Sequence, residues 1–557
     1  MKTIASVLCF CILSAVSAGG GDAQLSTLQS RIARLEADVQ GAEAIWAIKR
    51  LQYAYGHYAE FGLWHDLADL FAENGVGHYP AGDLGKEEIR KLFLQDVGKG
   101  KLGLADGMLY PHIMLQPVVI LAPDRKTARG RWRVLAMLGS YGGDAIWAGG
   151  IYENEYVLEN GAWKIKDLHY YSRYSGRYEQ SGWTADGGAV PLPPDPAHAG
   201  APIQDIANPL PPREKPQTLA ALSRRLAGLT HRAQMLSDAA DVENLQHAYG
   251  YYVDRKMWDD VADLFAADAT MELGRQGVYA GKRSIRRALD QFGRQGLQEG
   301  EVNDRLQLQT IVDIAADGRS AKARGVELAM LGVNGVSAQW GEGIFENEFV
   351  KYNGVWQFRV MHFYPRLLTD YDKGWAKDAK PAPGPSKEFP PDRPPTSVYE
   401  IFPKFFVPPF HFPNPVTGRA TRYPAETEPP VRRTSPEPIA DRTPVAGTLA
   451  ELSRRVAGTE RLTRSAVAYD AAENLASAYG YYLDEFMWDE TADLFARDGR
   501  RKFSTISDDD GRERIRESIK RRYPGKKSTD YFTVHQLIQP VIHVSIDGQT
   551  AKMRTRL

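Results

Sequence analysis

The sequence predicts an α+β protein built from tandem copies of one unit, each with N-terminal helices packed on a curved antiparallel sheet. Three observations predict this class. A long segment recurs, the first part of each copy has helical spacing, and the second part alternates with a period of two. The recurring segments are AYGHYAEFGLWHDLADLFA around Tyr55, AYGYYVDRKMWDDVADLFA around Tyr249 and AYGYYLDEFMWDETADLFA around Tyr479. A match of this length identifies a duplicated domain.

The first part of each copy is predicted to be helical. Apolar residues between positions 28 and 42 recur every three or four residues, which is typical of a helix with an apolar seam. The AYGHY segment and residues 63–72 are then expected to form two amphipathic helices. In the second of these, Trp64, Leu67, Ala68 and Phe71 fall on one face. Residues 86–95 predict a short third helix.

The second part of each copy is predicted to be an antiparallel sheet. In the first copy, the strands are expected in residues 108–122, 126–138, 150–159 and 162–171. Asn160-Gly161 joins the last two strands, and Asn353-Gly354 does so in the second copy. Asn-Gly favours a two-residue hairpin turn, because both central residues of that turn need positive φ.

Residues 1–18 have the pattern of a secretory signal, with one lysine, an apolar run and a small-residue cleavage site. We therefore expect an exported protein, periplasmic or secreted, with no stable membrane anchor once the signal is cleaved. Both cysteines, Cys9 and Cys11, lie in this segment. The mature chain would then contain no thiol, which excludes disulfides, cysteine–metal sites and a cysteine nucleophile.

The charge of the chain is balanced. Among 557 residues, 69 are Lys or Arg and 70 are Asp or Glu, so the net charge is −1. A nucleic-acid partner is not expected, because such proteins normally carry a basic stripe or tail. The sequence contains no phosphate-binding loop, no zinc-protease motif and no serine-hydrolase motif. We expect neither a cofactor nor a metal.

Two Pro-rich segments divide the chain. The expected parts are unit 1 with its helical leader (19–183), a linker (184–217), unit 2 with its leader (218–375), a second linker (376–447) and unit 3 (448–557). Unit 3 stops in the segment that matches residues 128–133, so we expect it to be incomplete. Residues 398–412 of the second linker carry six aromatic side chains. We expect this aromatic arm to lie across the surface of a domain.

Two motifs in these units are shared with a known family. W-x-x-x-A-D-L-F-A and the hairpin G-x-Y/F-E-N-E-Y/F-V … N-G-x-W resemble those of SnoaL-like domains, in the nuclear-transport-factor-2-like superfamily. Scytalone dehydratase and ketosteroid isomerase are enzymes of that superfamily. The resemblance covers residues 42–175 and 236–370 in full and 466–557 in part. It implies a cone, in which helices wrap a bent sheet and leave an apolar pocket at the open end.

An acid precedes the helix tryptophan by four positions in every copy, as Glu60, Asp254 and Asp484. The resemblance implies a pocket carboxylate at this position; the alternative is a solvated carboxylate or an ion-pair partner. It also implies a pocket histidine at His112 and, at Tyr79, a tyrosine that polarises a substrate carbonyl. In unit 1 the expected roles are therefore base for Glu60, proton carrier for His112 and hydrogen-bond donor for Tyr79.

Further residues are expected to line the pockets. Some of them lie at or beside the recurring acid or at the family's histidine positions. Others alternate along the third strand or lie at the end of the last strand. For each of them, packing in the core is the alternative. These candidate ligand contacts are Tyr58, Trp132, Tyr152, Asn154, Tyr156, His169, Asp254, Arg305, Asn347 and His362.

The sequence therefore predicts an exported tandem protein that binds a small, largely apolar, cyclic ligand. If it is an enzyme, unit 1 would carry a cofactor-independent lyase or isomerase reaction by general acid–base proton transfer. The rival hypothesis is a non-catalytic binding or assembly protein, in which sheet faces pair the units within one chain or between copies.

Overall fold

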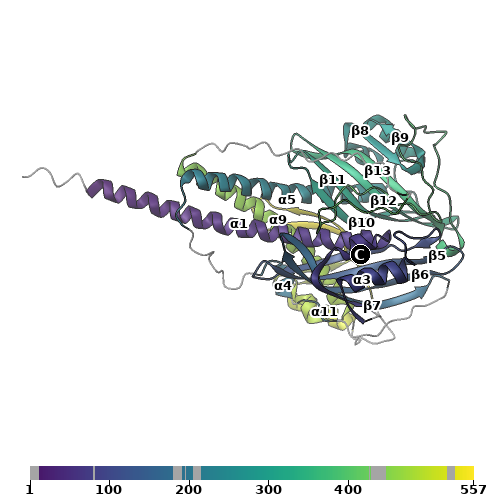
Figure 1. The fold of residues 1–557 in the computed structure, drawn as a ribbon, viewed down its shortest axis with the longest axis horizontal. Helices are drawn as coiled ribbons and strands as arrows, with labels where there is room; N and C mark the ends of the chain where they lie inside the picture. The colour runs from purple at the N-terminus through teal and green to yellow at the C-terminus, as the bar shows by residue number, and fades with distance from the viewer. Residues whose placement is uncertain are drawn as a thin grey trace, which may run out of the picture.

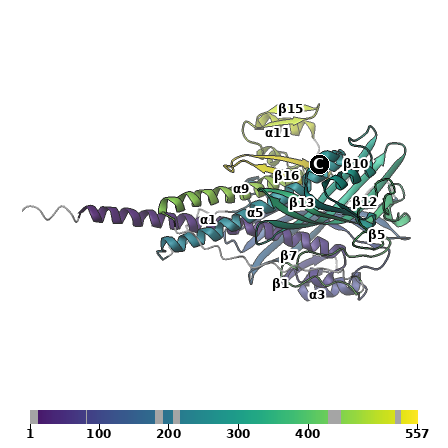
Figure 2. The ribbon, with the colours of Figure 1, turned by 90° about the horizontal axis from the view of Figure 1, so that it is seen from above.

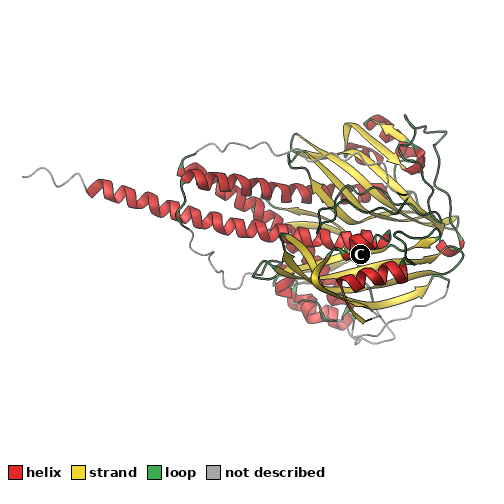
Figure 3. Ribbon diagram, viewed as in Figure 1, coloured by secondary structure: helices red, strands yellow, loops and turns green. Residues whose placement is uncertain are grey.

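The computed structural model describes residues 12–79, 82–179, 191–194, 196–204, 215–425, 427, 447–523 and 533–557. Three long helices organise it: α1 (Ile12–Glu60), α5 (Leu219–Asp254) and α9 (Leu449–Asp484). Their N-terminal halves run side by side and project from the body as a bundle (Figures 1 and 3). Leu28, Leu222 and Leu452 are buried together at the start of this bundle. The predicted leader of unit 1 thus forms one helix of an intramolecular three-helix bundle.

The leader and the AYGHY segment form one continuous helix, whereas we expected them to be separate. The predicted signal overlaps the start of α1, and its residues 1–11 lie outside the described ranges. The next helix is shorter than predicted, because α2 ends at Ala68 and Phe71 already pairs with Ile165 as the first residue of a strand. Within the described ranges, none of the helices combines the length and apolar character that a membrane span requires.

Unit 1 folds into a mixed sheet covered by helices. Its further elements are α2 (Trp64–Ala68), β1 (Phe71–Tyr79), β2 (Gly82–Gly85), α3 (Lys86–Leu92), a π-helix (Phe93–Val97), β3 (Met108–Leu109), β4 (His112–Leu121), β5 (Thr127–Ser140), β6 (Ala145–Glu159) and β7 (Ala162–Arg177). The strand order is β2-β1-β7-β6-β5-β3, with β4 also paired to β5. The four predicted strands are antiparallel, and the Asn160-Gly161 turn has φ of 53° and 79°. The parallel pairing of β1 with β7 was not predicted.

Unit 2 repeats this design. Its elements are α6 (Trp258–Asp263), β8 (Phe265–Leu273), β9 (Val278–Ala280), α7 (Lys282–Leu289), β10 (Glu301–Ile314), β11 (Ser320–Val333), β12 (Ser337–Tyr352) and β13 (Val355–Asp370). Their order is β10-β11-β12-β13-β8-β9. Short helices α4 (Pro196–Gly200) and α8 (Gly374–Lys377) lie in the connections.

In unit 3 the described elements after α9 are α10 (Trp488–Asp493), β14 (Arg500–Phe503), β15 (Ser507–Asp510), α11 (Arg512–Arg522), β16 (Ile538–Val544) and β17 (Ala551–Arg556). The strands pair as β14-β15 and β16-β17. Figure 2 shows unit 3, in yellow, and α3 and β1 of unit 1, in purple, on opposite sides of the long helices.

The three units form a closed ring around the long helices. Each of these helices packs on the sheet of its own unit and on the next sheet: α1 on β4 and β10, α5 on β10 and β16, and α9 on β16 and β4. A bulge in each of these strands places a glutamine with positive φ at the inter-unit contact, as Gln116, Gln309 and Gln539. The helix of one unit therefore sits against the strand of the next in the order 1, 2, 3 and back to 1.

The aromatic arm, residues 398–412, lies between units 1 and 2. Tyr399 stacks on Phe406 with ring centroids 4.1 Å apart, and Phe410 packs against Tyr58 at 5.6 Å. Beyond the arm, the Asn414 side chain donates a hydrogen bond to the Asp66 carbonyl at 2.9 Å. The arm does not simply cross the surface of one domain, as expected: four of its rings are buried in an apolar core that joins both units, and Phe405 and Phe406 are half-buried beside it.

Candidate functional site

The recurring acids lie at the C-terminal ends of the long helices, and each pairs with an arginine of the neighbouring unit. Glu60 is bonded to Arg366 of unit 2. Asp254 pairs with Arg556 of unit 3, and Asp484 with Arg133 of unit 1. All three carboxylates are buried. The recurrence of the acid is thus matched by a ring of ion pairs between units.

Charges around Glu60 keep its carboxylate ionised. Burial opposes ionisation, but the Arg366 guanidinium and the neighbouring His57 outweigh it and lower the pKa of Glu60 to about 2. The carboxylate of Glu342 lies 3.7 Å from the same guanidinium. Burial and the charge of Glu60 raise the pKa of Glu342. One guanidinium therefore serves two buried acids, and only Glu60 is held firmly as an anion.

Five tyrosines converge inside unit 1, and we call them the tyrosine cluster: Tyr55, Tyr79, Tyr110, Tyr152 and Tyr170. The hydroxyls of Tyr55 and Tyr79 are 3.4 Å apart. The ring centroid of Tyr152 is 6.0 Å from that of Tyr55 and 5.0 Å from that of Tyr170. Tyr55 and Tyr152 are buried, whereas Tyr79, Tyr110 and Tyr170 are half-buried. The cluster thus has a buried base and an accessible side.

His112 stands beside this cluster, with its ring centroid 4.3 Å from that of Tyr110. Its Nδ1 atom lies 3.0 Å from the Tyr110 carbonyl oxygen. A carbonyl only accepts hydrogen bonds, so Nδ1 carries the proton and Nε2 carries the lone pair. Burial lowers the pKa of His112, which favours the neutral imidazole. The histidine is therefore in the form that can accept a proton.

The three residues expected to catalyse do not form one hydrogen-bonded group. Among the described residues, no hydrogen bond joins Glu60, Tyr79 and His112 to one another. Tyr79 and His112 belong with the tyrosine cluster, whereas the Glu60 carboxylate is bonded across the interface to Arg366. The structure therefore brings together two of the three.

Several expected ligand contacts of unit 1 lie in a buried hydrogen-bond network. The Asn154 amide and the Tyr156 hydroxyl each donate to the Gln52 side-chain oxygen at 2.9 Å, and the Trp132 indole donates to Tyr156 at 2.9 Å. Tyr58 is fully buried and packs against Phe410 of the arm. The network ties α1 to the sheet beneath the cluster.

His169 is stacked between two rings. Its ring centroid is 4.7 Å from that of His78 and 4.0 Å from that of Tyr171. His78 in turn contacts Asp83 and Asp167. This position is half-buried at the end of the sheet, at the β1–β7 pairing, and separate from the network of Gln52.

The expected contacts of unit 2 are also engaged within the protein. Asn347 donates to Gln246 at 2.8 Å and accepts from the His362 backbone at 3.0 Å. Arg305, which replaces His112, donates to Glu327 at 2.8 Å. Burial lowers the pKa of His362 to about 4, so this histidine is neutral near pH 7. In unit 2 the position of the proton carrier is therefore filled by a half-buried ion pair.

Unit 3 contains an acid–histidine contact. The Asp484 carboxylate lies 2.7 Å from Nδ1 of His535, and it also binds Arg133 of unit 1. His535 is the unit 3 counterpart of His112, and Asp484 is the counterpart of Glu60. The sequence analysis expected an acid and a histidine to work together in unit 1, as Glu60 and His112. The short contact between the two aligned groups thus occurs in unit 3.

Three members of the tyrosine cluster, Tyr55, Tyr110 and Tyr170, were not predicted as site residues. Tyr110 lies two residues before His112, and Tyr170 follows His169 in the last strand. Alternation along a strand places residues two apart on one face, so this spacing was the signal for Tyr110.

Comparisons with known proteins identify a family that recurs along this chain. A family model described as SnoaL-like domain matches residues 40–169, 234–362 and 464–557. One similar solved structure is a putative scytalone dehydratase from Novosphingobium aromaticivorans, at 18% identity, covering 28% of this chain and 96% of that chain with a TM-score of 0.23. Another is ActVI-ORFA from Streptomyces coelicolor, at 17% identity, covering 23% and 95% with a TM-score of 0.21.

A third similar structure is an NTF2-like protein with a cystatin-like fold from Novosphingobium aromaticivorans, at 17% identity, covering 25% of this chain and 88% of that chain with a TM-score of 0.21. The α+β class and the tandem organisation are confirmed by the three family matches, which coincide with the three units. Because these matches cover more than half of the chain, the protein belongs to the SnoaL-like domain family.

Proposed function

We propose that unit 1 binds a small, flat, cyclic and largely apolar ligand at the tyrosine cluster. The observation that carries this proposal is the convergence of tyrosine hydroxyls and His112 on one partly accessible place. Aromatic rings supply apolar walls, and a few hydroxyls orient the polar group of a ligand. SnoaL-like domains typically bind small molecules, in agreement with this assignment.

The protonation state of the tyrosines defines which ligand group they suit. Burial raises the pKa of Tyr55 well above its ordinary value, and burial raises that of Tyr79 as well. Both side chains therefore remain neutral and offer O–H donors. A carbonyl or phenolic oxygen on a ring system fits such donors best.

A second candidate function is proton transfer next to a carbonyl of the bound ligand. The lone pair on Nε2 of neutral His112 supports it, and Tyr79 would polarise the carbonyl. Glu60 is not assigned the base in this version, because Arg366 holds its carboxylate in an ion pair. We expect His112→Ala to abolish turnover of a bound ketone while largely preserving its binding.

The binding proposal is tested with 2-naphthol, whose fluorescence reports its environment. Tyr55→Phe removes one hydroxyl of the cluster, and Tyr249→Phe is the matched change at the equivalent position of unit 2. We expect Tyr55→Phe to raise the Kd about fivefold, the effect of one hydrogen bond, and Tyr249→Phe to leave it unchanged. Equal effects of the two variants, or no saturable binding by the wild type, would contradict the proposal.

We also propose that the protein is exported. This rests on the signal-like pattern of residues 1–18. Expression of the full chain in a secreting host, followed by mass measurement of the exported product, should give a chain that starts at position 19. An intact N-terminus retained inside the cell would contradict export.

A further inference from the structure

Equivalent positions of α1, α5 and α9 meet in layers along the axis of the ring. The first layers are apolar, with Leu28, Leu222 and Leu452 followed by Ile32, Leu226 and Val456. Further along the helices the same spacing brings Lys49 of unit 1 to the position of Glu243 and Glu473. We call these last three residues the charged layer. Its members are chemically different although their positions are equivalent.

The charged layer is buried and its charges are complementary. The Lys49 ammonium lies 2.6 Å from the Glu473 carboxylate and 3.8 Å from that of Asp470, with its side chain only 4% exposed. The Glu243 carboxylate accepts a hydrogen bond from the Tyr469 hydroxyl at 2.8 Å. Burial disfavours charge on Lys49, but the surrounding carboxylates outweigh it and raise its pKa. A single cation thus balances a group of acids.

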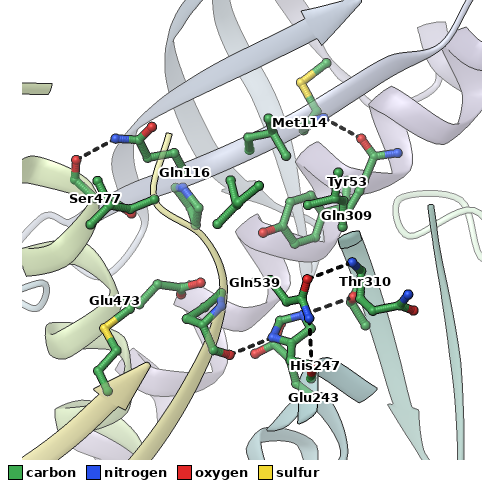
Figure 4. Close-up of a pocket in the computed structure, with 18 residues that line it drawn as sticks. Tyr53, Met114, Gln116, Glu243, His247, Gln309, Thr310, Glu473, Ser477 and Gln539 are labelled. Atoms are coloured by element: carbon green, nitrogen blue, oxygen red, sulfur yellow. Dashed lines mark hydrogen bonds between the residues drawn. The ribbon is translucent and has the colours of Figure 1, made fainter. Parts of the chain in front are cut away.

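A cavity of about 30 Å³ lies at this layer (Figure 4). It is lined by Tyr53, His247 and Ser477, which again occupy equivalent positions on the three helices. This volume has room for only a few water molecules. The axis is therefore polar and narrow here, so a change of charge in this layer would be poorly solvated.

One residue later, the three helices contact the strand of the next unit in two different ways. Asn474 donates to and accepts from the backbone of Val119 at 2.7 and 3.1 Å, and Asn244 does the same with Ile542 at 2.7 and 2.8 Å. A backbone is the same in any strand, so these contacts do not distinguish between units.

At the same helix position unit 1 has Arg50, which pairs with the Asp313 carboxylate of unit 2. The residues aligned with Asp313 are Ile120 in unit 1 and His543 in unit 3. Against either of these strands Arg50 would lack a carboxylate partner. The helix of unit 1 therefore matches the strand of unit 2 specifically.

We propose that the charged layer and the Arg50–Asp313 pair fix the order of the units around the axis. The Arg50–Asp313 pair makes the helix of unit 1 selective for the strand of unit 2, and the charged layer rejects further copies of the same unit. Three copies of unit 2 or unit 3 would bring three glutamates together in this layer, and three copies of unit 1 would bring three lysines. Removing a partner from a buried charge is strongly unfavourable, whereas a single complementary arrangement satisfies all of them.

The test reverses charges in the full-length chain and then restores complementarity. Lys49→Glu should lower the Tm by about 10 °C, the effect of breaking a buried ion pair in a large domain. It should also yield larger species in light scattering after refolding, as units pair between chains. The double variant Lys49→Glu with Glu473→Lys again has one cation and two acids, and we expect it to regain most of the Tm and the wild-type molar mass.

The Arg50–Asp313 pair gives a second, independent set of single and double charge reversals. Arg50→Asp should be destabilising, and the swap of Arg50→Asp with Asp313→Arg should recover the Tm. Lys91→Glu, a charge reversal on the exposed part of α3, is the control and should change neither Tm nor molar mass. Single reversals that behave like this control, or double swaps no better than the single variants, would overturn the proposal.

Discussion

Units 1 and 2 share one fold but differ inside it. The tyrosine cluster of unit 1 includes Tyr79, Tyr152 and Tyr170, and the aligned residues of unit 2 are Leu273, Phe345 and Phe363. Unit 2 keeps the rings of the sheet positions and loses their hydroxyls. The difference teaches that the fold depends on the apolar bulk of these three positions, whereas of the two units only unit 1 carries hydroxyls there.

The two units also differ where they meet their neighbours. Arg366 of unit 2 lies between Glu60 and Glu342, whereas the aligned Arg173 of unit 1 faces Glu485 of unit 3 at 3.3 Å. Equivalent arginines thus serve different numbers of acids. Three sets of substitutions should measure how much these differences between units 1 and 2 contribute to stability.

The largest effect is expected for the arginines at the interfaces. Arg366→Met leaves two buried carboxylates without their cation and should lower the free energy of unfolding by about 3–5 kcal/mol. Arg173→Met, the matched change, affects one acid and should cost about 1–2 kcal/mol, since its own side chain is 15% exposed. Urea denaturation measures both. Equal losses would show that the second acid, Glu342, contributes nothing to the difference.

An exchange of hydroxyls between the units should have an intermediate effect. Phe345→Tyr puts a hydroxyl into the apolar interior of unit 2, where Phe345 is 3% exposed and packs closely over Gly325. We expect a loss of about 1–3 kcal/mol in the free energy of unfolding, from the buried polar group and from crowding. Tyr152→Phe in unit 1 should cost less than about 1 kcal/mol. A stabilised Phe345→Tyr variant would contradict the contrast between the two interiors.

The last effect is a pH dependence that belongs to unit 2, which is small near pH 5 and grows as the pH rises. Unit 1 has Gly149 at the position of Glu342, so only unit 2 carries this buried acid. Since the folded-state pKa of Glu342 is raised, its contribution to stability is present below about pH 4.5 and is lost as the pH rises.

The Glu342→Gln variant tests this dependence. The wild type should lose up to about 1.4 kcal/mol per pH unit relative to Glu342→Gln above pH 5, while the two proteins should be alike at pH 4.5. Urea midpoints across this range provide the measurement. Parallel curves for the two proteins would show that Glu342 does not carry the dependence.

Local signals were sufficient to predict the four antiparallel strands of unit 1, but not β1 or the continuity of α1. Asn160-Gly161 set the hairpin because its residues tolerate positive φ, and the period of two identified the strands. The change from helix to strand before Phe71 was missed, because an apolar side chain suits a helix face as well as a strand. Phe71 belongs to a strand because it pairs with Ile165. The parallel pairing of β1 with β7 is likewise a long-range contact that no local spacing encodes.

The site was predictable only in part, for the same physical reason. Tyr79 and His112 were found from the resemblance to SnoaL-like domains, which implies a pocket tyrosine and a pocket histidine at these positions. The partner of Glu60 is Arg366, which lies in another unit and follows no helical or strand period from Glu60. The recurrence of the acid in all three copies was consistent with a pocket carboxylate and with an ion pair. The structure shows that each acid forms an ion pair with an arginine of the neighbouring unit.

The covalent connection of the units through the Pro-rich segments has a genetic consequence. In a trimer of identical chains every substitution is made three times at once, so a lysine introduced near the axis would face two more lysines. In this chain a single substitution alters one of the three units and leaves the other two unchanged. Lys49 opposite Glu243 and Glu473, and hydroxyls present in unit 1 but not at the aligned positions of unit 2, are combinations that a trimer of identical chains could not contain.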